Sequence, residues 1–144
     1  MRNPYGGEMR THGRPRALVV DDQEMIRLLA ARVLCDGGWS VETAGGVAEA
    51  LALRPLGFDV LVIDTRLGAE RGTELLAALR LDDPLVPRRC LILSGASTDP
   101  APDDVAVLLK PFRADDLLDA VNRLSGRPTV DDDPPGGGRQ RRTG

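Results

Sequence analysis

The sequence is poor in the residues that most enzymes use for acid–base or metal chemistry. Its 144 residues include one histidine and two cysteines, and 3% of them are aromatic. The histidine, His12, lies in a polar N-terminal segment, so the core offers no imidazole for a metal site or a Ser-His-Asp triad. Cys35 and Cys90 each lie in an apolar stretch and are predicted to be small buried hydrophobes. Any chemistry must therefore use carboxylates, hydroxyls or lysine.

Long apolar runs and an excess of basic charge are also missing. No apolar stretch approaches the roughly 20 residues of a membrane span, and the polar start of the chain lacks the apolar segment of a signal peptide. The net charge of −3 disfavours general nucleic-acid binding, which needs a basic surface to neutralise phosphates. We therefore expect a cytoplasmic protein that binds neither nucleic acid nor membrane directly.

Lysine is the scarcest charged residue of the chain. Among 19 basic residues there is a single lysine, Lys110, and every other one is arginine. It ends an apolar run, "VAVLL", and lies directly before Pro111. This placement marks Lys110 as a candidate functional residue.

The length and composition predict one folded domain between two tails. Hydrophobic residues make up 42% of the chain and charged residues 28%, which are ordinary values for a globular domain. Residues 1–15 are rich in glycine, proline and arginine and are predicted to be a disordered arm. Residues 126–144 combine glycine, proline and charge and are predicted to be a disordered tail. The folded domain is expected at residues 16–125.

Between the tails, short apolar runs alternate with segments of helical period. Continuous apolar runs predict strands buried on both faces, and a period near 3.6 residues predicts amphipathic helices. Strands separated by helices imply right-handed crossovers and a parallel sheet covered on both faces. The predicted fold class is α/β, a doubly wound five-stranded parallel sheet. Its strands are expected at 17–20, 40–44, 59–64, 89–95 and 105–109, and its helices at 23–38, 47–55, 72–83 and 113–126.

Polar residues end four of the five predicted strands, and function collects at the carboxyl ends of such strands. Asp21 and Asp22 follow the first strand, and Asp64, Ser94 and Lys110 end the third, fourth and fifth. Three carboxylates at one edge repel each other and require protonation or a cation. A ligand set made only of oxygen suits Mg²⁺ or Mn²⁺ better than Zn²⁺.

These groups together predict phosphoryl transfer onto a carboxylate, with an aspartyl phosphate as the product. Mg²⁺ held by carboxylates is the usual partner of phosphoryl groups. The ammonium of Lys110 would neutralise the transferred oxygens, and the hydroxyl of Ser94 would donate to one of them. Gly95 would leave space for the phosphoryl group.

The motifs "LVVDD", "DVLVIDTRL", "LILSG" and "LLKPF" resemble the receiver domain of two-component response regulators. The resemblance covers residues 16–125, and its strength lies in the combination and order of the motifs. It implies a flavodoxin-like sheet with strand order 2-1-3-4-5. It also implies a switch that is not an enzyme acting on other substrates. Its phosphoryl group would come from a histidine kinase or a phosphotransfer protein.

The resemblance implies a phosphoacceptor and a set of metal ligands. Asp64 would be the phosphoacceptor and also a metal ligand. Asp22 would bind Mg²⁺ directly, and Asp21 would bind it through water. The backbone carbonyl of Arg66 would complete the metal shell.

The resemblance also implies roles for the residues around the phosphoryl group. Ser94 would move toward that group after transfer. Lys110 would pair with Asp64 before transfer and with the phosphoryl oxygens afterwards. The peptide bond before Pro111 is commonly cis in such domains, and cis bonds are essentially a proline phenomenon. Gly72 matches the glycine that usually opens the helix after the phosphorylation loop.

Three features depart from the family pattern. Val107 stands where the family usually has an aromatic residue that rotates inward on activation. The segment from Ser94 to Lys110 is about six residues shorter than the family pattern, or about one and a half helical turns. It also contains two prolines, so its helix, the fourth of the family fold, is expected to be short or missing. Gly68 stands where a proline often follows the phosphorylation loop.

The short or missing fourth helix bears on the oligomeric state. Because the fourth-helix face commonly forms the signalling dimer, we expect a monomer or a weak dimer.

Two alternative functions stay open at the level of the sequence. The first is a Mg²⁺-dependent aspartyl-phosphate phosphatase, but Arg66 stands where that class usually has its general acid. The second is a receiver-like interaction module that is not phosphorylated. No DNA-binding output domain fits in the tail. The chain is therefore expected to be a single-domain regulator that signals through protein contacts, or a fragment of a longer protein.

Overall fold

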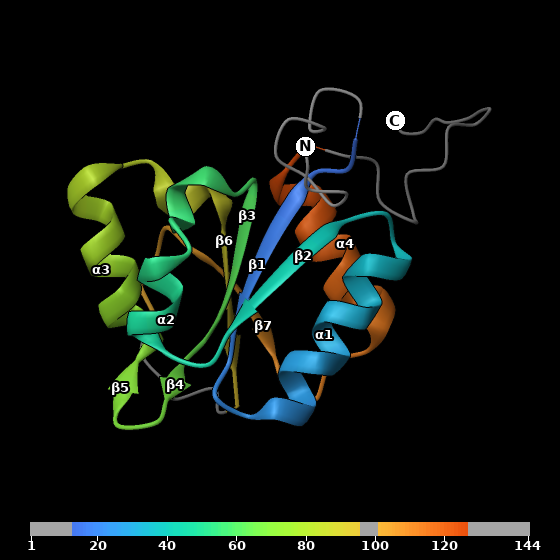
Figure 1. The fold of residues 1–144 in the computed structure, drawn as a ribbon, viewed down its shortest axis with the longest axis horizontal. Helices are drawn as coiled ribbons and strands as arrows, with labels where there is room; N and C mark the ends of the chain where they lie inside the picture. Colours follow the sequence, from blue (N-terminus) through green and yellow to red (C-terminus); the bar gives the residue numbers. More distant parts are fainter. Residues whose placement is uncertain (1–12, 96–100, 127–144) are drawn as a thin grey trace.

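A computed structural model describes residues 13–95 and 101–126 of the chain. Five parallel strands form one sheet in the order β2-β1-β3-β6-β7 (Figure 1). The predicted order 2-1-3-4-5 is confirmed, because β6 and β7 are the fourth and fifth strands of this sheet in chain order. The predicted arm 1–15 and tail 126–144 lie almost entirely outside the described residues.

Each strand of the sheet lies within one residue of its predicted position. The three central strands are β1 (Arg16–Val20), β3 (Val60–Asp64) and β6 (Cys90–Ser94), and their apolar runs are almost wholly buried. The edges are β2 (Ser40–Ala44), which is exposed at its middle residue, and β7 (Ala106–Leu109), whose side chains alternate between partly buried and exposed. This difference follows from position, because only central strands are covered on both faces along their whole length.

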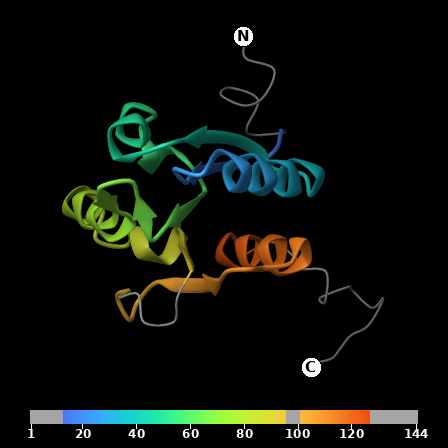
Figure 2. The same ribbon diagram turned by 90° about the horizontal axis from the view of Figure 1, so that it is seen from below.

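In the part of the chain that the structure describes, four α-helices cover the two faces of the sheet. Figures 1 and 2 show α1 (Glu24–Asp36) and α4 (Ala114–Leu124) on one face, and α2 (Val47–Ala52) and α3 (Gly72–Asp82) on the other. Each face has its own apolar core, built from alternate residues of the same strands. No helix in the described residues is long and apolar enough to cross a membrane.

The connection between β6 and β7 has no helix in its described part, residues 101–105. This agrees with the predicted loss of the fourth family helix, and the remainder of the connection, 96–100, lies outside the described residues. Asp104 accepts two hydrogen bonds from Arg80 of α3, with N–O distances of 2.7 and 3.0 Å. Val105 is buried in the core on the α3 side. A bidentate ion pair and one apolar side chain therefore hold this segment against α3.

The two cysteines differ in their surroundings. Cys90 is fully buried at the start of β6, and burial raises the pKa of its thiol to about 12. It is therefore a protonated, unreactive core residue at neutral pH. Cys35 on α1 is only partly buried, so the prediction of full burial was wrong for this residue. It lies in the last turn of α1, next to the buried Leu34.

The only tryptophan of the chain, Trp39, lies just before β2 at the amino-terminal edge of the sheet. Its side chain is fully buried in the core beneath α1 and α4. The indole Nε1 donates a hydrogen bond of 2.9 Å to Oδ1 of Asn122 on α4. This bond satisfies the polar atom of a large buried ring and ties α4 to the β1–β2 side of the sheet.

Candidate acidic site at the carboxyl edge of the sheet

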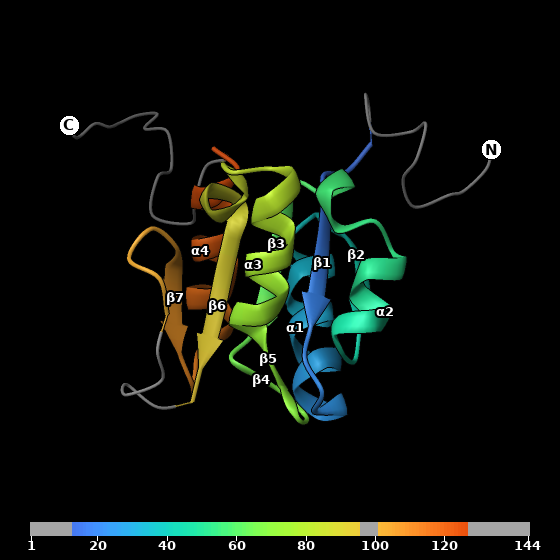
Figure 3. The ribbon, with the colours of Figure 1, turned by 90° about the vertical axis from the view of Figure 1, so that its left-hand side faces the viewer.

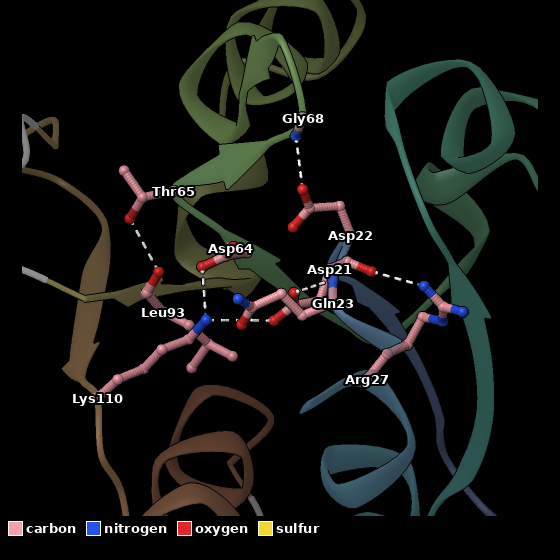
Figure 4. Close-up of polar contacts among 9 residues, drawn as sticks. All are labelled: Asp21, Asp22, Gln23, Arg27, Asp64, Thr65, Gly68, Leu93 and Lys110. Atoms are coloured by element: carbon pink, nitrogen blue, oxygen red, sulfur yellow. Dashed lines mark hydrogen bonds and ion pairs between the residues drawn. The ribbon is translucent and has the colours of Figure 1, made fainter. Parts of the chain in front are cut away.

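Asp22, Asp64 and Lys110, at the carboxyl ends of β1, β3 and β7, line a pocket of about 460 Å³, and the buried Asp21 lies directly behind it (Figure 4). Oxygen atoms of Asp21, Asp22 and Asp64 lie within 4.8 Å of one another. Lys110 reaches this cluster from the end of β7. The pocket is lined by Asp22, Gln23, Asp64, Thr65, Arg66, Gly68, Gly95 and Lys110.

Asp21 is the most deeply buried member of the cluster, and its surroundings fix its position. Its Oδ1 accepts a 2.9 Å hydrogen bond from the backbone N–H of Gln23, and its Oδ2 lies 3.4 Å from Nζ of Lys110. Its backbone carbonyl accepts a 2.9 Å bond from the guanidinium of Arg27, as Figure 4 shows. A buried carboxylate needs such partners, because an unpaired charge in the interior is costly.

Asp22 points toward the loop that follows β3. Its carboxylate accepts a 2.8 Å hydrogen bond from the backbone N–H of Gly68. Gly68 has a φ of +68°, in the left-handed region that favours glycine, and it lies between two short strands, β4 (Arg66–Leu67) and β5 (Glu70–Arg71). A proline at position 68 has neither this φ nor an N–H to donate. Because glycine replaces the usual proline at position 68, the backbone N–H of this residue can donate a hydrogen bond to Asp22.

Asp64 and Lys110 form the closest ion pair of the site, with 3.0 Å between Oδ1 and Nζ. Both side chains are largely buried. The Lys110–Pro111 peptide bond is cis. The N–H of Lys110 continues the sheet by donating a 2.8 Å bond to the carbonyl of Ser94. The lysine is thus held by its backbone to β6 and by its ammonium to β3 and β1.

Burial and the ion pair shift the pKa values of Asp64 and Lys110 in opposite directions. Burial raises the pKa of Asp64, the hydrogen bond from Lys110 lowers it, and the charges of Asp21 and Asp22 raise it again, so the pKa lies above its ordinary value. Burial lowers the pKa of Lys110, but the hydrogen bond to Asp64 and the nearby carboxylates outweigh it and raise that pKa. Lys110 is therefore a permanent cation at neutral pH, facing carboxylates that repel one another.

Gly72 allows α3 to begin directly against Asp64. A Cβ atom at this position would lie 2.1 Å from the backbone oxygen of Asp64 and 2.7 Å from a methyl group of Ile63. The N–H of Gly72 donates a 2.8 Å bond to the carbonyl of Thr65. Only a residue without a side chain allows the start of α3 to lie this close to Asp64, which explains why residue 72 is glycine.

Ser94 and Gly95 lie at the end of β6, on the far side of Asp64 from β1. Ser94 is buried, and Gly95 lines the pocket with nothing within 4 Å of the place that a Cβ atom would occupy. Thr65, directly after Asp64, donates hydrogen bonds of 2.9 and 2.8 Å from its N–H and its hydroxyl to the carbonyl of Leu93. These bonds hold β3 and β6 together where the sheet ends, so the distance between the two strands is fixed beside Asp64.

Three residues of the site were not predicted from the sequence. Arg27 and Gln23 hold Asp21 through its carbonyl and carboxylate, and Thr65 joins β3 to β6. Thr65 had one usable signal, its place directly after a strand-end aspartate. Each of these two contacts with Asp21 involves a backbone group, the carbonyl of Asp21 or the N–H of Gln23, and a single sequence gives no signal for such contacts.

The donor set of the site fits a hard divalent cation. Carboxylate oxygens from Asp21, Asp22 and Asp64 converge, and the described residues bring no histidine or thiolate to them. Cations of this kind prefer oxygen ligands, and a cation at this point would relieve the repulsion among the carboxylates. The geometry is suited to phosphoryl chemistry at Asp64, with Lys110 opposite.

The conserved sequence pattern of the response regulator receiver domain matches residues 17–122. The chain belongs to this family. Among known proteins, this receiver domain is similar to the alginate biosynthesis transcriptional regulatory protein AlgB of Pseudomonas aeruginosa, with 36% identity over 120 residues. It is also similar to the transcriptional regulatory protein TcrA of Mycobacterium tuberculosis, with 34% identity over 119 residues. The matches cover 78% of the chain in both cases, but 26% of AlgB and 46% of TcrA.

Solved structures of response regulators also resemble the structure of this chain. The chemotaxis response regulator CheY4 of Vibrio cholerae matches 77% of the chain and 98% of its own length, with a TM-score of 0.68 and 29% identity. NtrX of Brucella abortus matches 77% of the chain and 27% of its own length, with a TM-score of 0.69 and 29% identity. The resemblance therefore extends to small receiver proteins and to parts of larger regulators.

Proposed function

We propose that the receiver domain accepts a phosphoryl group on Asp64 from a histidine kinase or a phosphotransfer protein, in a Mg²⁺-dependent reaction. The observation that carries this proposal is the 3.0 Å contact between Oδ1 of Asp64 and Nζ of Lys110, beside the carboxylates of Asp21 and Asp22. In this reaction Asp64 is the nucleophile and Lys110 stabilises the charge on the transferred oxygens.

Asp21, Asp22, Asp64 and the backbone carbonyl of Arg66 would hold the cation. Bound Mg²⁺ or Mn²⁺ supplies positive charge that offsets the carboxylates and the phosphoryl oxygens. Asp22 has one oxygen on the N–H of Gly68, so its other oxygen is available as a ligand. The buried Asp21 acts through water, because its two oxygens already contact Gln23 and Lys110.

The transfer exchanges one bond to phosphorus for another. The P–N bond of the donor phosphohistidine breaks, and its electron pair stays on the imidazole nitrogen. A P–O bond forms to the Asp64 carboxylate. Lys110 then pairs with the phosphoryl oxygens, Ser94 moves toward them, and Gly95 gives them room. Attack of water on phosphorus later returns Asp64 and inorganic phosphate.

The first turns of α1 offer a surface for a protein donor. Met25, Leu28 and Leu29 are 80%, 52% and 51% exposed, and they follow the acidic loop directly in the sequence. Three large apolar side chains on adjacent turns beside a reactive pocket are unusual on a free surface and suit a protein partner. We infer that this part of α1 docks the phosphodonor while Asp64 receives the group. Signalling through protein contacts in the cytoplasm completes the proposal.

Incubation with Mg²⁺ and acetyl phosphate tests the proposal. Intact-mass measurement is expected to find one added phosphoryl group on the chain, labile as an acyl phosphate, and none without divalent cation. Asp64→Asn is expected to abolish the adduct. Asp82→Asn, at an exposed aspartate at the end of α3, is the matched control and should leave the adduct unchanged.

The two alternative functions give different results in the same assay. Rapid turnover of a phosphate ester without a stable adduct would favour the phosphatase. A chain that forms no adduct with acetyl phosphate or with a phosphorylated histidine kinase would be an interaction module. Either result would overturn the proposal for Asp64.

A further inference from the structure

The three carboxylates of the acidic site are held in place by different contacts. Asp21 and Asp64 are buried, and both contact Nζ of Lys110, at 3.4 and 3.0 Å. Asp22 is exposed, and the described residues give its carboxylate one hydrogen bond, from the N–H of Gly68. Figure 4 shows Asp22 pointing toward Gly68, away from Lys110. The orientation of Asp22 therefore depends on a single backbone donor.

This one bond is strong enough to select an orientation for Asp22. An exposed aspartate samples several staggered rotamers in water, and fixing one of them costs conformational entropy. The N–O distance of 2.8 Å is that of a charge-assisted hydrogen bond, one of the stronger kinds in proteins. The bond uses Oδ2 and leaves Oδ1 without a hydrogen bond. Asp22 is thus oriented before any cation binds.

The N–H of Gly68 is a donor that its own hairpin does not use. Leu67 pairs with Glu70 across the hairpin, and Gly68 and Ala69 lie between them as a two-residue turn. Gly68 has a φ of +68° and Ala69 has no positive φ, which is the pattern of a type II′ turn with glycine first. Because the ladder pairs the residues on either side of the turn, the N–H of Gly68 lies outside it.

The neighbours of Gly68 hold this donor in place. Figure 3 shows β4 and β5 where β3 ends and α3 begins, at the carboxyl edge of the sheet. Leu67 is 3% exposed and packs in the core on the α3 side. At the other end of the hairpin, the N–H of Gly72 donates a 2.8 Å bond to the carbonyl of Thr65. A donor supported in this way orients its acceptor more precisely than a donor on an unsupported loop.

We propose that Gly68 is a positioning residue of the cation site, and that its N–H orients Asp22 to bind a divalent cation. The inference rests on the cation site proposed above for Asp21, Asp22 and Asp64. In metalloproteins, loss of a hydrogen-bond partner of a metal ligand commonly weakens metal binding by about 10–100-fold. Glycine at position 68 therefore adds a contact that the proline common in the family cannot make, because proline has no N–H.

The same bond couples the cation to the hairpin. Coupling between two equilibria is reciprocal, so a cation that binds Asp22 in this orientation must also stabilise the bond from Gly68. A glycine that is needed only for the positive φ of the turn would show no such coupling. Because Gly68 lies on an exposed turn, its amide distinguishes the two roles.

Mn²⁺ binding to the full chain, measured by loss of the free-ion EPR signal, tests the positioning role. Gly68→Pro removes the N–H and is expected to raise the dissociation constant of Mn²⁺ by about tenfold. Gly68→Asn keeps the N–H, tolerates a left-handed φ and adds a Cβ that meets nothing within 4 Å, so it should bind like the wild type. Circular dichroism establishes that each variant is folded.

Gly126→Pro is the matched control for the proline substitution. Gly126 also has a left-handed φ, of +77°, but it lies after the last turn of α4 rather than at the pocket. This variant should bind Mn²⁺ with wild-type affinity.

Amide hydrogen exchange of the wild type, followed by NMR, tests the coupling without a substitution. Saturating Mg²⁺ should slow exchange of the Gly68 amide by about tenfold, the factor by which Gly68→Pro weakens cation binding. The amide of Ala69 in the same turn has no hydrogen-bond acceptor among the described residues, so its exchange should be the same in Mg²⁺ and in EDTA.

The outcomes separate the role of Gly68 from the proposed function. Wild-type Mn²⁺ affinity in Gly68→Pro, weakened binding in Gly68→Asn, or Gly68 exchange that Mg²⁺ does not slow would each overturn the positioning role, whereas the adduct at Asp64 would be unaffected. A wild type that binds Mn²⁺ but forms no adduct would contradict the proposed phosphorylation and not the positioning role. Mn²⁺ binding that is equal in the wild type and Asp64→Asn would place the cation elsewhere and overturn both.

Discussion

The acidic pocket and the β7 side of the sheet lie next to each other, but the residues of the pocket are held in place much more tightly. At the pocket, Gly72 touches the backbone of Asp64, Asp21 is fully buried, and hydrogen bonds hold all three carboxylates or their loops. On the β7 side, aliphatic side chains are exposed, and one ion pair to α3 secures the segment before the strand. The phosphoryl transfer proposed for the pocket requires fixed distances, whereas the surface around β7 has no such requirement. Substitutions should therefore have large effects at the pocket and small ones beside β7.

Gly72→Ala should have the largest effect on folding. The new Cβ would meet backbone atoms of Asp64, which cannot move without breaking the end of β3. We expect a loss of about 3 kcal/mol or more in the free energy of unfolding, measured by urea denaturation. Gly46→Ala is the control, because a Cβ there meets nothing within 4 Å. Similar stability of the two variants would show that the pocket is looser than its contacts imply.

Lys110→Arg should slow phosphorylation without unfolding the protein. The positive charge is kept, but the longer planar guanidinium does not fit between Asp21 and Asp64, which lie 3.4 and 3.0 Å from Nζ. We expect phosphorylation by acetyl phosphate to slow by about tenfold or more. Arg123→Lys, an exposed change of the same kind on α4, should leave the rate unchanged. A wild-type rate in Lys110→Arg would mean that charge alone is sufficient.

Asp64→Asn should stabilise the protein in the absence of divalent cations. Because folding raises the pKa of Asp64, its contribution to stability is fully present below the ordinary value of 3.8 and is lost as pH rises through the folded pKa. At neutral pH the ionised carboxylate therefore destabilises the fold. Thermal melts in EDTA should show a higher Tm for the variant at neutral pH. The difference should shrink as the pH falls toward 3.8.

Mg²⁺ should give the wild type a higher Tm than Asp64→Asn, the reverse of the order expected in EDTA. A cation that binds only the folded wild type adds about 2.7 kcal/mol when its concentration is a hundred times the dissociation constant. Asp64→Asn lacks one carboxylate ligand of the cation, so Mg²⁺ should stabilise this variant less than the wild type. Equal gains in Tm for the two proteins would place the cation away from Asp64.

Arg80→Ala should have the smallest effect of the series. The Arg80–Asp104 pair is partly exposed, with 33% and 56% of the two side chains accessible to solvent, and such pairs contribute little to global stability. The expected change is local: backbone amides of residues 101–105 should exchange faster with solvent, while the Tm barely changes. Arg32→Ala, which removes the exposed Arg32–Asp36 pair of α1, should leave those amides unaffected. A large fall in Tm for Arg80→Ala would mean that the β7 side is as constrained as the pocket.

The sheet and its main helices were predictable because their signals are local. Apolar runs such as residues 60–63 predict buried strands, and Gly37 lies directly after the last residue of α1. The helix expected over residues 47–55 is shorter than predicted, because α2 ends at Ala52 and Pro55 begins a short 3-10 helix, Pro55–Gly57. The strands β4 and β5 gave no such signal. Their four residues have no alternation, and the hairpin depends on the φ of Gly68 and its bond to Asp22.

The reactive groups of the site were predictable for a similar reason, but their supports were not. Asp64 and Lys110 end apolar runs, and the parallel topology brings such ends to one edge. The carbonyl of Asp21, by contrast, binds a guanidinium from the next helix. That contact depends on the angle at which α1 leaves the loop, which no residue type in a single sequence specifies.

The position of Trp39 determines what optical methods can detect in this protein. The indole is buried at the amino-terminal edge of the sheet and bonded to Asn122, whereas the carboxylates lie at the carboxyl edge. Its emission should be that of an indole shielded from water and should change little when a cation or a phosphoryl group arrives at Asp64. The same emission should shift to longer wavelength when α4 separates from the sheet. Intrinsic fluorescence is therefore a measure of unfolding that ligand titrations leave undisturbed.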